Sequence, residues 1–178
     1  VVPPARQLSV ALVSRGNLFL SAAMRGLPLS RLDVFTPEEF EKAVREGRRG
    51  DYEVVALDGW LPATGGAPPT PPEEGREVEI GLPPGRYLVF DAVPSGALVE
   101  TGDAGTAQVI DWRRDHPVLR SVGLESLVIG KLRQVEPVPG AGAQVLARAD
   151  KGPAIFDIQD SDARAIVCVF DSAQSNWP

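Results

Sequence analysis

Three predicted strands of this 178-residue chain end in an aspartate, and carboxylates in such positions can bind a metal ion. They are Asp58 after VVAL, Asp91 after YLVF and Asp171 after IVCVF. Because open α/β sheets bind ligands at the carboxyl ends of their strands, the three side chains could converge there on Mg²⁺, which prefers oxygen ligands. The alternative is that each aspartate caps the turn that follows its own strand. We favour capping and expect neither a metal nor a cofactor.

The only histidine, His116, is the one side chain suited to act as a general base. A catalytic triad also needs a nucleophile within reach of that base and an acid that orients it. The turn after YLVF is the place where α/β hydrolases and amidotransferases carry Ser or Cys, and here it reads DAVP, with Ser95 as its nearest hydroxyl. His116 itself lies between Asp115 and Pro117, where a structural role in a turn is ordinary. We therefore expect no catalytic residue.

The single cysteine, Cys168, lies inside the apolar run AIVCVF. One cysteine excludes an intrachain disulfide and a Cys-based zinc site. The apolar surroundings favour a buried, inert thiol that contributes to the core.

The first half of the chain alternates apolar runs with helical patterns, which is typical of a parallel sheet with helices on its faces. Asn17 is a good N-cap for a helix over LFLSAAMRGL, and Thr36-Pro37-Glu38-Glu39 is a capping box with Pro at the first helical position. The order predicts an α/β, doubly wound, mostly parallel sheet. Its expected strands are 7–13, 31–35, 52–57 and 87–90.

The second half is predicted to be richer in β-structure. A short helix VLRSV is expected after Pro117, then a strand over 127–135 and a final buried strand over 164–170. Between them, 143–149 and 154–158 are expected to pair across Asp150-Lys151-Gly152 as a C-terminal β-hairpin at an edge of the sheet.

Residues 61–85 hold seven of the 17 prolines and five of the 18 glycines, so no crossover helix can form there. We expect a long, partly disordered loop, with a short extended piece over 77–80.

Composition places the chain among ordinary globular proteins, as one domain over residues 1–178. The net charge is −6, and residues 61–178 carry 10 Lys/Arg against 16 Asp/Glu. An acidic surface repels phosphate backbones, so nucleic acid is not an expected partner. No apolar run approaches the roughly 20 residues that span a bilayer. The start VVPPARQ lacks Met and the chain stops at NWP just after a strand, so we expect both ends to be truncated from a longer protein.

Several motifs resemble the class I glutamine amidotransferase-like domain of bacterial membrane-anchored von Willebrand factor A proteins with a BatA (aerotolerance-type) region. They are YLVFDAVP, VIDWRRDHPVLRSVGLESLVIGKL, VLARADKGPAIF and VCVFDSAQSNWP, together with VALVSRGNLFLSAAMRGLP and VVALDGWLP. The resemblance implies a flavodoxin-like sheet with a C-terminal hairpin. True amidotransferases place Cys after the strand that corresponds to YLVF and use a later His-x-Glu pair. Here that position is Asp91 or Ala92, and His116-Pro117-Val118 has no Glu, so the resemblance implies a pseudo-enzyme.

The function expected from these features is a non-catalytic interaction or ligand-sensing domain of a larger membrane-associated protein. Its surface would be Asp58, Gly59, Trp60 and Asp91 with the loop 61–85, since large aromatics such as Trp60 are favoured at interfaces when they are not buried. A protein partner is expected, and a membrane only through other parts of the parent protein, of which this chain would be a soluble domain. One alternative is a metal-dependent hydrolase or transferase that uses the three strand-end aspartates. Another is a structural spacer.

Overall fold

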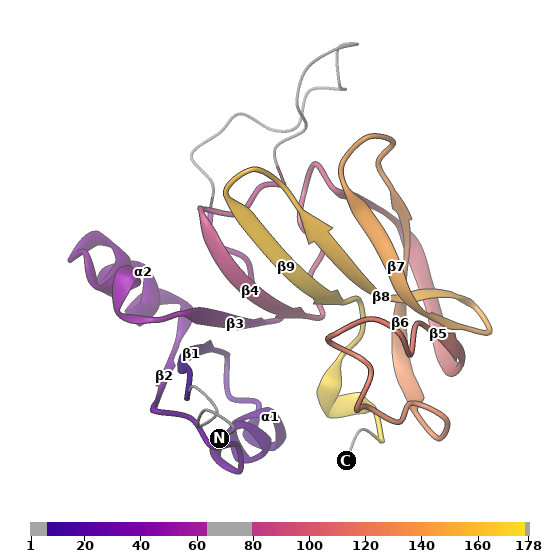
Figure 1. The fold of residues 1–178 in the computed structure, drawn as a ribbon, viewed down its shortest axis with the longest axis horizontal. Coiled ribbons are helices and arrows are strands. Elements are labelled where there is room, and N and C mark those ends of the chain that lie inside the picture. Colours follow the sequence, from indigo (N-terminus) through magenta and orange to yellow (C-terminus); the bar gives the residue numbers. More distant parts are fainter. Residues whose placement is uncertain (1–6, 64–79, 177–178) are drawn as a thin grey trace, which may run out of the picture.

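The computed structural model describes residues 7–63 and 80–176, which form one nine-stranded sheet with two short helices (Figure 1). The strands lie in the order β2-β1-β3-β4-β9-β8-β7-β5-β6. The pairs from β2 to β9 are parallel, and those from β9 to β6 are antiparallel. The α/β class is therefore confirmed, in a sheet with a parallel half and an antiparallel half. The strands are β1 (Ser9–Val13), β2 (Arg31–Phe35), β3 (Val54–Asp58), β4 (Gly85–Phe90), β5 (Leu98–Trp112), β6 (Val128–Pro137), β7 (Ala143–Ala149), β8 (Gly152–Gln159) and β9 (Ala163–Cys168).

Two capped helices connect the first three strands. In α1 (Leu18–Arg25) the Asn17 side chain accepts from the Leu20 amide, and α2 (Pro37–Arg45) begins with the predicted capping box. Because β1 lies between β2 and β3, the two crossovers run in opposite directions, and two right-handed crossovers then place their helices on opposite faces. Figure 1 shows this arrangement, with α1 below and α2 above this part of the sheet. Short 3₁₀ turns follow at η1 (Arg48–Asp51) and η2 (Ser172–Gln174).

The core runs through both halves of the sheet. The central residues of β1 and β3 are fully buried, as expected for parallel strands covered on both faces. Phe156 of β8, in the antiparallel half, and Phe170, which follows β9, are fully buried as well. One continuous hydrophobic cluster results.

The predicted hairpin exists, but it lies inside the sheet and not at an edge. The missed element is β5, a 15-residue strand that pairs with β7 on one side and β6 on the other. Its sequence LVETGDAGTAQVIDW contains no long apolar run, and its pairing with β6 is shifted at three places, so no simple alternation marks it. Because β5 covers the outer side of β7, the hairpin becomes internal.

The short helix predicted after Pro117 is also wrong. The amides of Leu119 and Arg120 both donate to the carbonyl of His116, and Val122 donates to Leu119. These bonds make successive turns, and no helix forms. Residues 64–79 are not among the described residues. The loop predicted there, and most of the extended piece predicted over 77–80, therefore lie outside the part that the structure describes.

Candidate functional site

The carboxyl ends of the parallel strands gather Asp58, Asp91 and Asp171 at one edge of the sheet. Asp58 is the last residue of β3, Asp91 follows β4, and Asp171 begins η2 shortly after β9. Burial raises the pKa of Asp58, and the negative charges of Asp171 and Asp91 add to this rise. The three carboxylates therefore lie close enough to interact, as their positions at parallel strand ends predict.

Asp58 is held by the loop between β1 and α1. The Ser14 hydroxyl donates to one of its carboxylate oxygens at 2.7 Å, and the Asn17 side-chain amide donates to the other at 3.3 Å. Asn17 also donates to the Ser172 hydroxyl at 2.9 Å, so the network reaches η2. Asp58 therefore ties three loops together, and capping its own turn is not its role.

Asp91 occupies the turn after β4 where related folds carry a nucleophile. Its φ of 49° lies in the left-handed region, which non-glycine residues seldom adopt. Arg133 of β6 donates from Nε to its carboxylate at 2.7 Å and from Nη1 to Glu100 at 2.8 Å. The backbone amide of Asp91 donates to the carbonyls of Cys168 and Phe170. Both the carboxylate and the amide of this turn are thus already bound by protein groups.

Asp171 is the one strand-end aspartate that caps its own turn. Its carboxylate accepts from the Ala173 amide at 2.8 Å and from the Gln174 side chain at 2.6 Å. Over residues 7–63 and 80–176, no three His, Cys, Asp or Glu side chains are arranged to hold a metal ion.

The two other residues predicted for this surface differ in accessibility. Gly59 is exposed, with a φ of 61°, and its amide donates to the carbonyl of Phe90. Trp60 is half-buried and packs edge-on against Phe40 of α2, with ring centroids 6.4 Å apart. The indole of Trp60 therefore lies against the α2 face and does not project from the turn.

The most exposed large apolar side chains of the described residues, Leu18 and Phe19, stand at this same edge. They are 78% and 76% exposed at the start of α1, next to the Asn17 cap. Helical spacing predicts that Leu20, Ala23, Met24 and Leu27 face the sheet, and it says nothing of Leu18 and Phe19. The prediction holds for Leu20 and Met24 and is wrong for Ala23 and Leu27, which are exposed; Leu27 lies beyond the helix, which ends at Arg25. Leu18 and Phe19, the first two residues of the helix, lie off the buried stripe of Leu20 and Met24.

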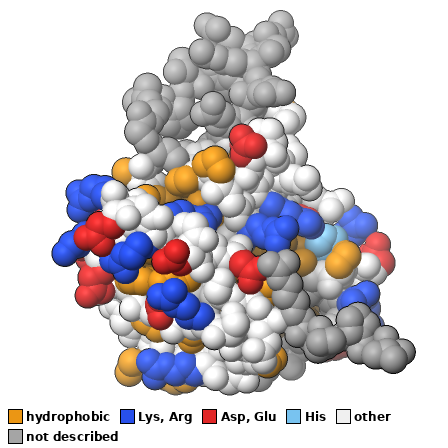
Figure 2. Space-filling view, turned by 60° about the vertical axis from the view of Figure 1, so that its left-hand side comes forward, with side chains coloured by type: hydrophobic (Ala, Val, Ile, Leu, Met, Phe, Trp, Pro, Cys, Tyr) orange, Lys and Arg blue, Asp and Glu red, His pale blue; other side chains and the backbone are white. Residues whose placement is uncertain are grey.

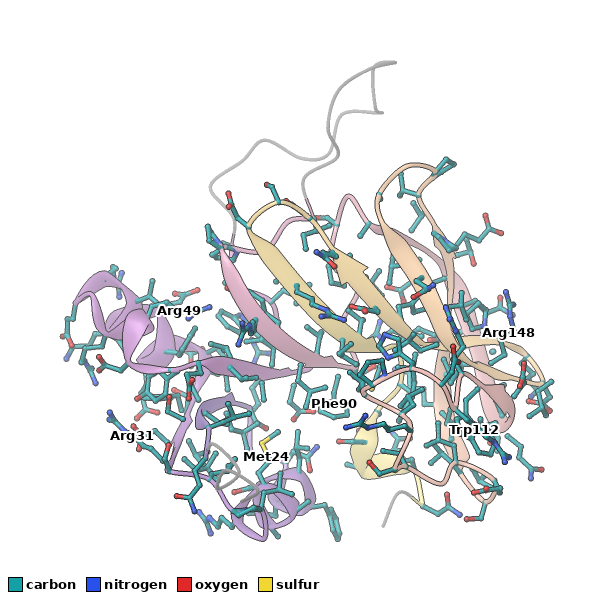
Figure 3. The ribbon with its side chains drawn as sticks, viewed as in Figure 1. Met24, Arg31, Arg49, Phe90, Trp112 and Arg148 are labelled. Carbon is teal, nitrogen blue, oxygen red and sulfur yellow. The ribbon has the colours of Figure 1, made fainter. Side chains whose placement is uncertain are left out.

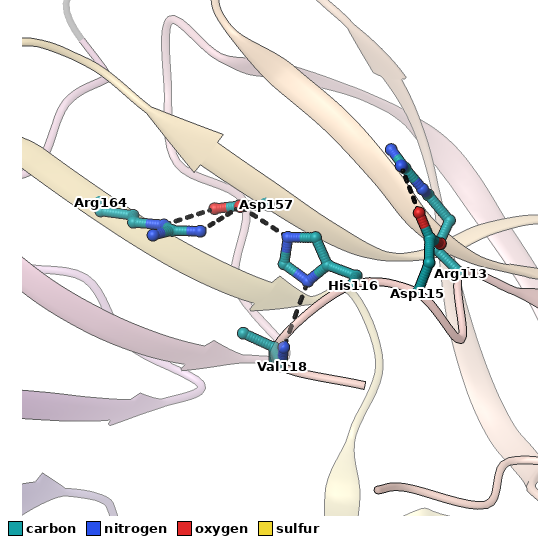
Figure 4. Close-up of polar contacts among 6 residues, drawn as sticks. All are labelled: Arg113, Asp115, His116, Val118, Asp157 and Arg164. Carbon is teal, nitrogen blue, oxygen red and sulfur yellow. Dashed lines mark hydrogen bonds and ion pairs between the residues drawn. The ribbon is translucent and has the colours of Figure 1, made fainter. Parts of the chain in front are cut away.

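His116 lies in a separate, buried cluster (Figure 4). Its Nε2 is 3.2 Å from the carboxylate of Asp157 in β8, and its Nδ1 accepts from the Val118 amide at 3.4 Å. Arg164 of β9 binds the same carboxylate with two bonds, of 3.1 and 2.7 Å. Among the described residues, no nucleophilic side chain contacts this cluster. The contacts of the cluster connect the 113–127 segment to the sheet.

A buried carboxylate needs a cationic or hydrogen-bonding partner, and that need is the signal by which this cluster could have been found. Asp157 is the one charged residue in the apolar run of β8 and is 8% exposed. In the pairing of β8 with β9, Asp157 lies opposite Ile166. Arg164, two residues before Ile166, is therefore on the same face of the sheet, from which its side chain binds Asp157.

Cys168 is buried as predicted, with 2% of its surface exposed. Burial raises the pKa of its thiol to about 12. Thiolate, the nucleophilic form, is therefore scarce at neutral pH.

Comparisons with known proteins identify the fold. No family model matches the chain, and no curated protein does. Among solved structures, a putative ThuA-like protein from Parabacteroides merdae is 14% identical with a TM-score of 0.50, over 92% of this chain and 79% of that one. A cytoplasmic protein from Salmonella typhimurium LT2 is 11% identical with a TM-score of 0.51, over 92% and 88%. At these identities the likeness shows the fold alone.

These neighbours confirm the flavodoxin-like fold and overturn part of the resemblance drawn from the sequence. The assignment to von Willebrand factor A and BatA-type proteins is wrong, since the neighbour with a described family is a putative ThuA-like protein. The predicted membrane-anchored parent is contradicted as well, because a structural neighbour is a cytoplasmic protein. No helix in the described part of the chain is long and apolar enough to cross a membrane. The motifs that suggested the family are short strands and turns, which the flavodoxin-like fold itself requires.

Proposed function

We propose that this chain is a non-catalytic interaction or ligand-sensing domain, with a protein as its partner. Its binding surface is the carboxyl edge of the parallel strands, where Asp58, Gly59 and Asp91 lie beside the exposed side chains of Leu18 and Phe19. The exposure of this apolar pair carries the proposal. Two large apolar side chains more than three-quarters exposed at the usual ligand edge of the fold are typical of a docking site.

The polar groups of this edge support binding more than catalysis. A nucleophile and a general base must be free to meet a substrate. Here the Asp58 carboxylate accepts from two side-chain donors, and the Asp91 carboxylate binds the guanidinium of Arg133. The histidine is bound elsewhere, to Asp157. A pseudo-enzyme is consistent with this use of the polar side chains to fix loops.

The second candidate is a metal-dependent hydrolase or transferase, and one observation favours it. Asp58 feels the charges of both Asp91 and Asp171, as members of a metal site without its ion would. Against it, Arg133 neutralises Asp91 and the Ala173 amide holds Asp171. Thermal unfolding with EDTA and then with millimolar Mg²⁺ or Mn²⁺ separates the two. A midpoint raised by several degrees, and no longer raised in Asp58→Asn, would establish the metal site.

The proposal is tested by site-specific photo-crosslinking in the native host. A photoreactive phenylalanine analogue replaces Phe19 in one variant and Ile110, a 64% exposed apolar residue of β5, in the matched control. We expect a discrete crosslinked protein from position 19 that is absent from position 110. The Leu18→Ser variant, crosslinked through position 19, should lose most of that product.

The pseudo-enzyme part has its own measurement. The purified chain should release no ammonia from glutamine above the buffer control. Glutaminase turnover that disappears in Cys168→Ala would overturn this part of the proposal, and equal crosslinking from positions 19 and 110 would overturn the docking surface.

A further inference from the structure

We propose that the outer edge of β2 binds an extended peptide segment of a partner protein, in which apolar and acidic residues alternate, as an added strand of the sheet. This site is separate from the carboxyl-edge surface, and it does not rest on the function proposed for that surface.

The edge of β2 is open to strand addition. β2 is the terminal strand of the sheet and pairs with β1 on one side, and over residues 7–63 and 80–176 no strand pairs with its other side. Alternate N–H and C=O groups of an edge strand point outward and can pair with another chain. Proteins commonly block such edges with charged side chains, Pro or a bulge. The sequence RLDVF has no Pro and no bulge, and its two charged residues, Arg31 and Asp33, bind each other.

The two faces of this strand differ in chemistry. The Phe35 ring packs against Phe40 and Tyr52, and the Arg31 guanidinium lies 5.1 Å from the Tyr52 ring centre. These odd-numbered residues therefore face the α2 side. Because side chains alternate along a strand, Leu32 and Val34 face the α1 side.

A groove of about 570 Å³ runs along this edge. On the α1 side, Leu27 is 56% and Val34 45% exposed, and Met24 points from α1 toward the sheet (Figure 3). A peptide strand beside β2 would place every second side chain in this apolar part. About five residues fit alongside the five of β2, at roughly 3.3 Å per residue.

The charges of the groove select acidic residues for the remaining positions. Its lining includes Arg25, Arg31 and Arg48 against a single acid, Asp33, although the whole chain carries a net charge of −6. Arg31 also pairs with Asp33 and Arg48 with Glu46, but both arginine side chains stay about half exposed and can bind a further carboxylate. The Tyr52 hydroxyl and the Arg31 guanidinium both bind Asp33 and lower the pKa of its carboxyl. In Figure 2, which turns this side of the molecule forward, hydrophobic side chains are exposed between clusters of Lys/Arg and Asp/Glu.

The same charges disfavour a second copy of this chain as the occupant. A two-fold pairing of β2 with β2 about its middle residue, the one register that pairs all five residues, would bring two arginine-rich grooves together and place Asp33 opposite Asp33. Like charges directly opposite each other destabilise a strand pair. An acidic, extended partner segment satisfies both the main-chain groups and the arginines.

The test is the fluorescence anisotropy of a labelled nine-residue peptide in which valine and glutamate alternate, titrated with the purified chain. We expect saturable binding that weakens at least tenfold in Leu27→Asp and severalfold in Arg48→Glu, at the arginine of the α2 side. The matched controls are Val44→Asp, at a 41% exposed residue of α2 outside the groove, and Arg45→Glu beside it. Both should bind as the unmodified chain does.

Two further peptides and one measurement make the test decisive. The same peptide with alternate backbone nitrogens methylated cannot pair as a strand and should not bind, and a valine–lysine peptide should bind at least tenfold more weakly. Absence of binding at millimolar peptide, or equal binding of the methylated peptide, would overturn the proposal. So would a dimer in sedimentation equilibrium that Leu27→Asp dissociates, since the occupant would then be a second copy.

Discussion

The parallel half of the sheet (β2, β1, β3, β4 and β9) and the antiparallel half (β8, β7, β5 and β6) place their charged side chains differently. In the parallel half every strand ends at the same edge, so Asp58 and Asp91 meet there beside solvent. In the antiparallel half Asp157 lies mid-strand under the 113–127 segment and is buried. An aspartate at a shared edge can bind loops and remain partly hydrated, whereas a buried one depends on its cationic partners. The two halves should therefore respond differently to the loss of a carboxylate.

The largest expected effect is in the antiparallel half. Asp157→Ala removes the acceptor of both Arg164 and His116, and we expect the free energy of unfolding to fall by about 3 kcal/mol, because two charge-assisted bonds are lost and the buried His116 ring loses its partner. Urea unfolding measures this loss. Asp103→Ala, at an exposed aspartate of β5, is the control and should change stability by less than about 0.5 kcal/mol. A loss below 1 kcal/mol in Asp157→Ala would show that the two halves do not differ in this respect.

Asp91 is expected to give the largest effect in the parallel half. Asp91→Ala loses the charge-assisted bond to Arg133 while keeping a side chain at a φ of 49°, so we expect a loss of about 2 kcal/mol. Asp91→Gly loses the same bond but relieves the backbone, and it should be about 1 kcal/mol more stable than Asp91→Ala. Urea unfolding of the pair separates the ion pair from the strain. Equal stabilities would mean that the left-handed turn costs little.

How much the sequence predicted also differs between the halves. The strands and helices up to β4 follow from apolar runs separated by Asn17 and the Thr36 capping box, because local signals determine a crossover unit. The antiparallel half depends on the pairing of distant segments. β5 has no apolar run, so neither its existence nor the internal position of the hairpin could be read locally, and Asp157 could not be matched to His116 without the fold. Of the candidate site, the convergence of the aspartates was predictable, but the partners Ser14 and Arg133 were not.

Cys168 provides a smaller effect at the boundary between the halves, since β9 pairs with both β4 and β8. Cys168→Ala removes one buried sulfur atom, so we expect a loss of about 1 kcal/mol in unfolding free energy. Burial raises the pKa of this thiol to about 12, so it should resist an aromatic disulfide reagent at pH 8 until the chain is unfolded in urea. Rapid labelling of the folded chain would show that this boundary opens readily.

The smallest effect is the dependence of stability on pH at Asp58. Burial raises the pKa of Asp58, so the folded chain binds this proton more tightly than the unfolded chain does. The stabilisation linked to that proton is greatest below the ordinary pKa of an aspartate and is lost as the pH rises through the higher pKa of the folded state. Compared with Asp58→Asn, the unmodified chain should therefore lose relative stability between pH 4 and pH 7, and at pH 7 the two should agree within about 0.5 kcal/mol. Urea unfolding of both chains at unit steps of pH measures the difference. A difference that changes in the opposite direction would mean that the Ser14 and Asn17 donors stabilise the Asp58 charge by more than burial destabilises it, so that the edge is built to hold an anion.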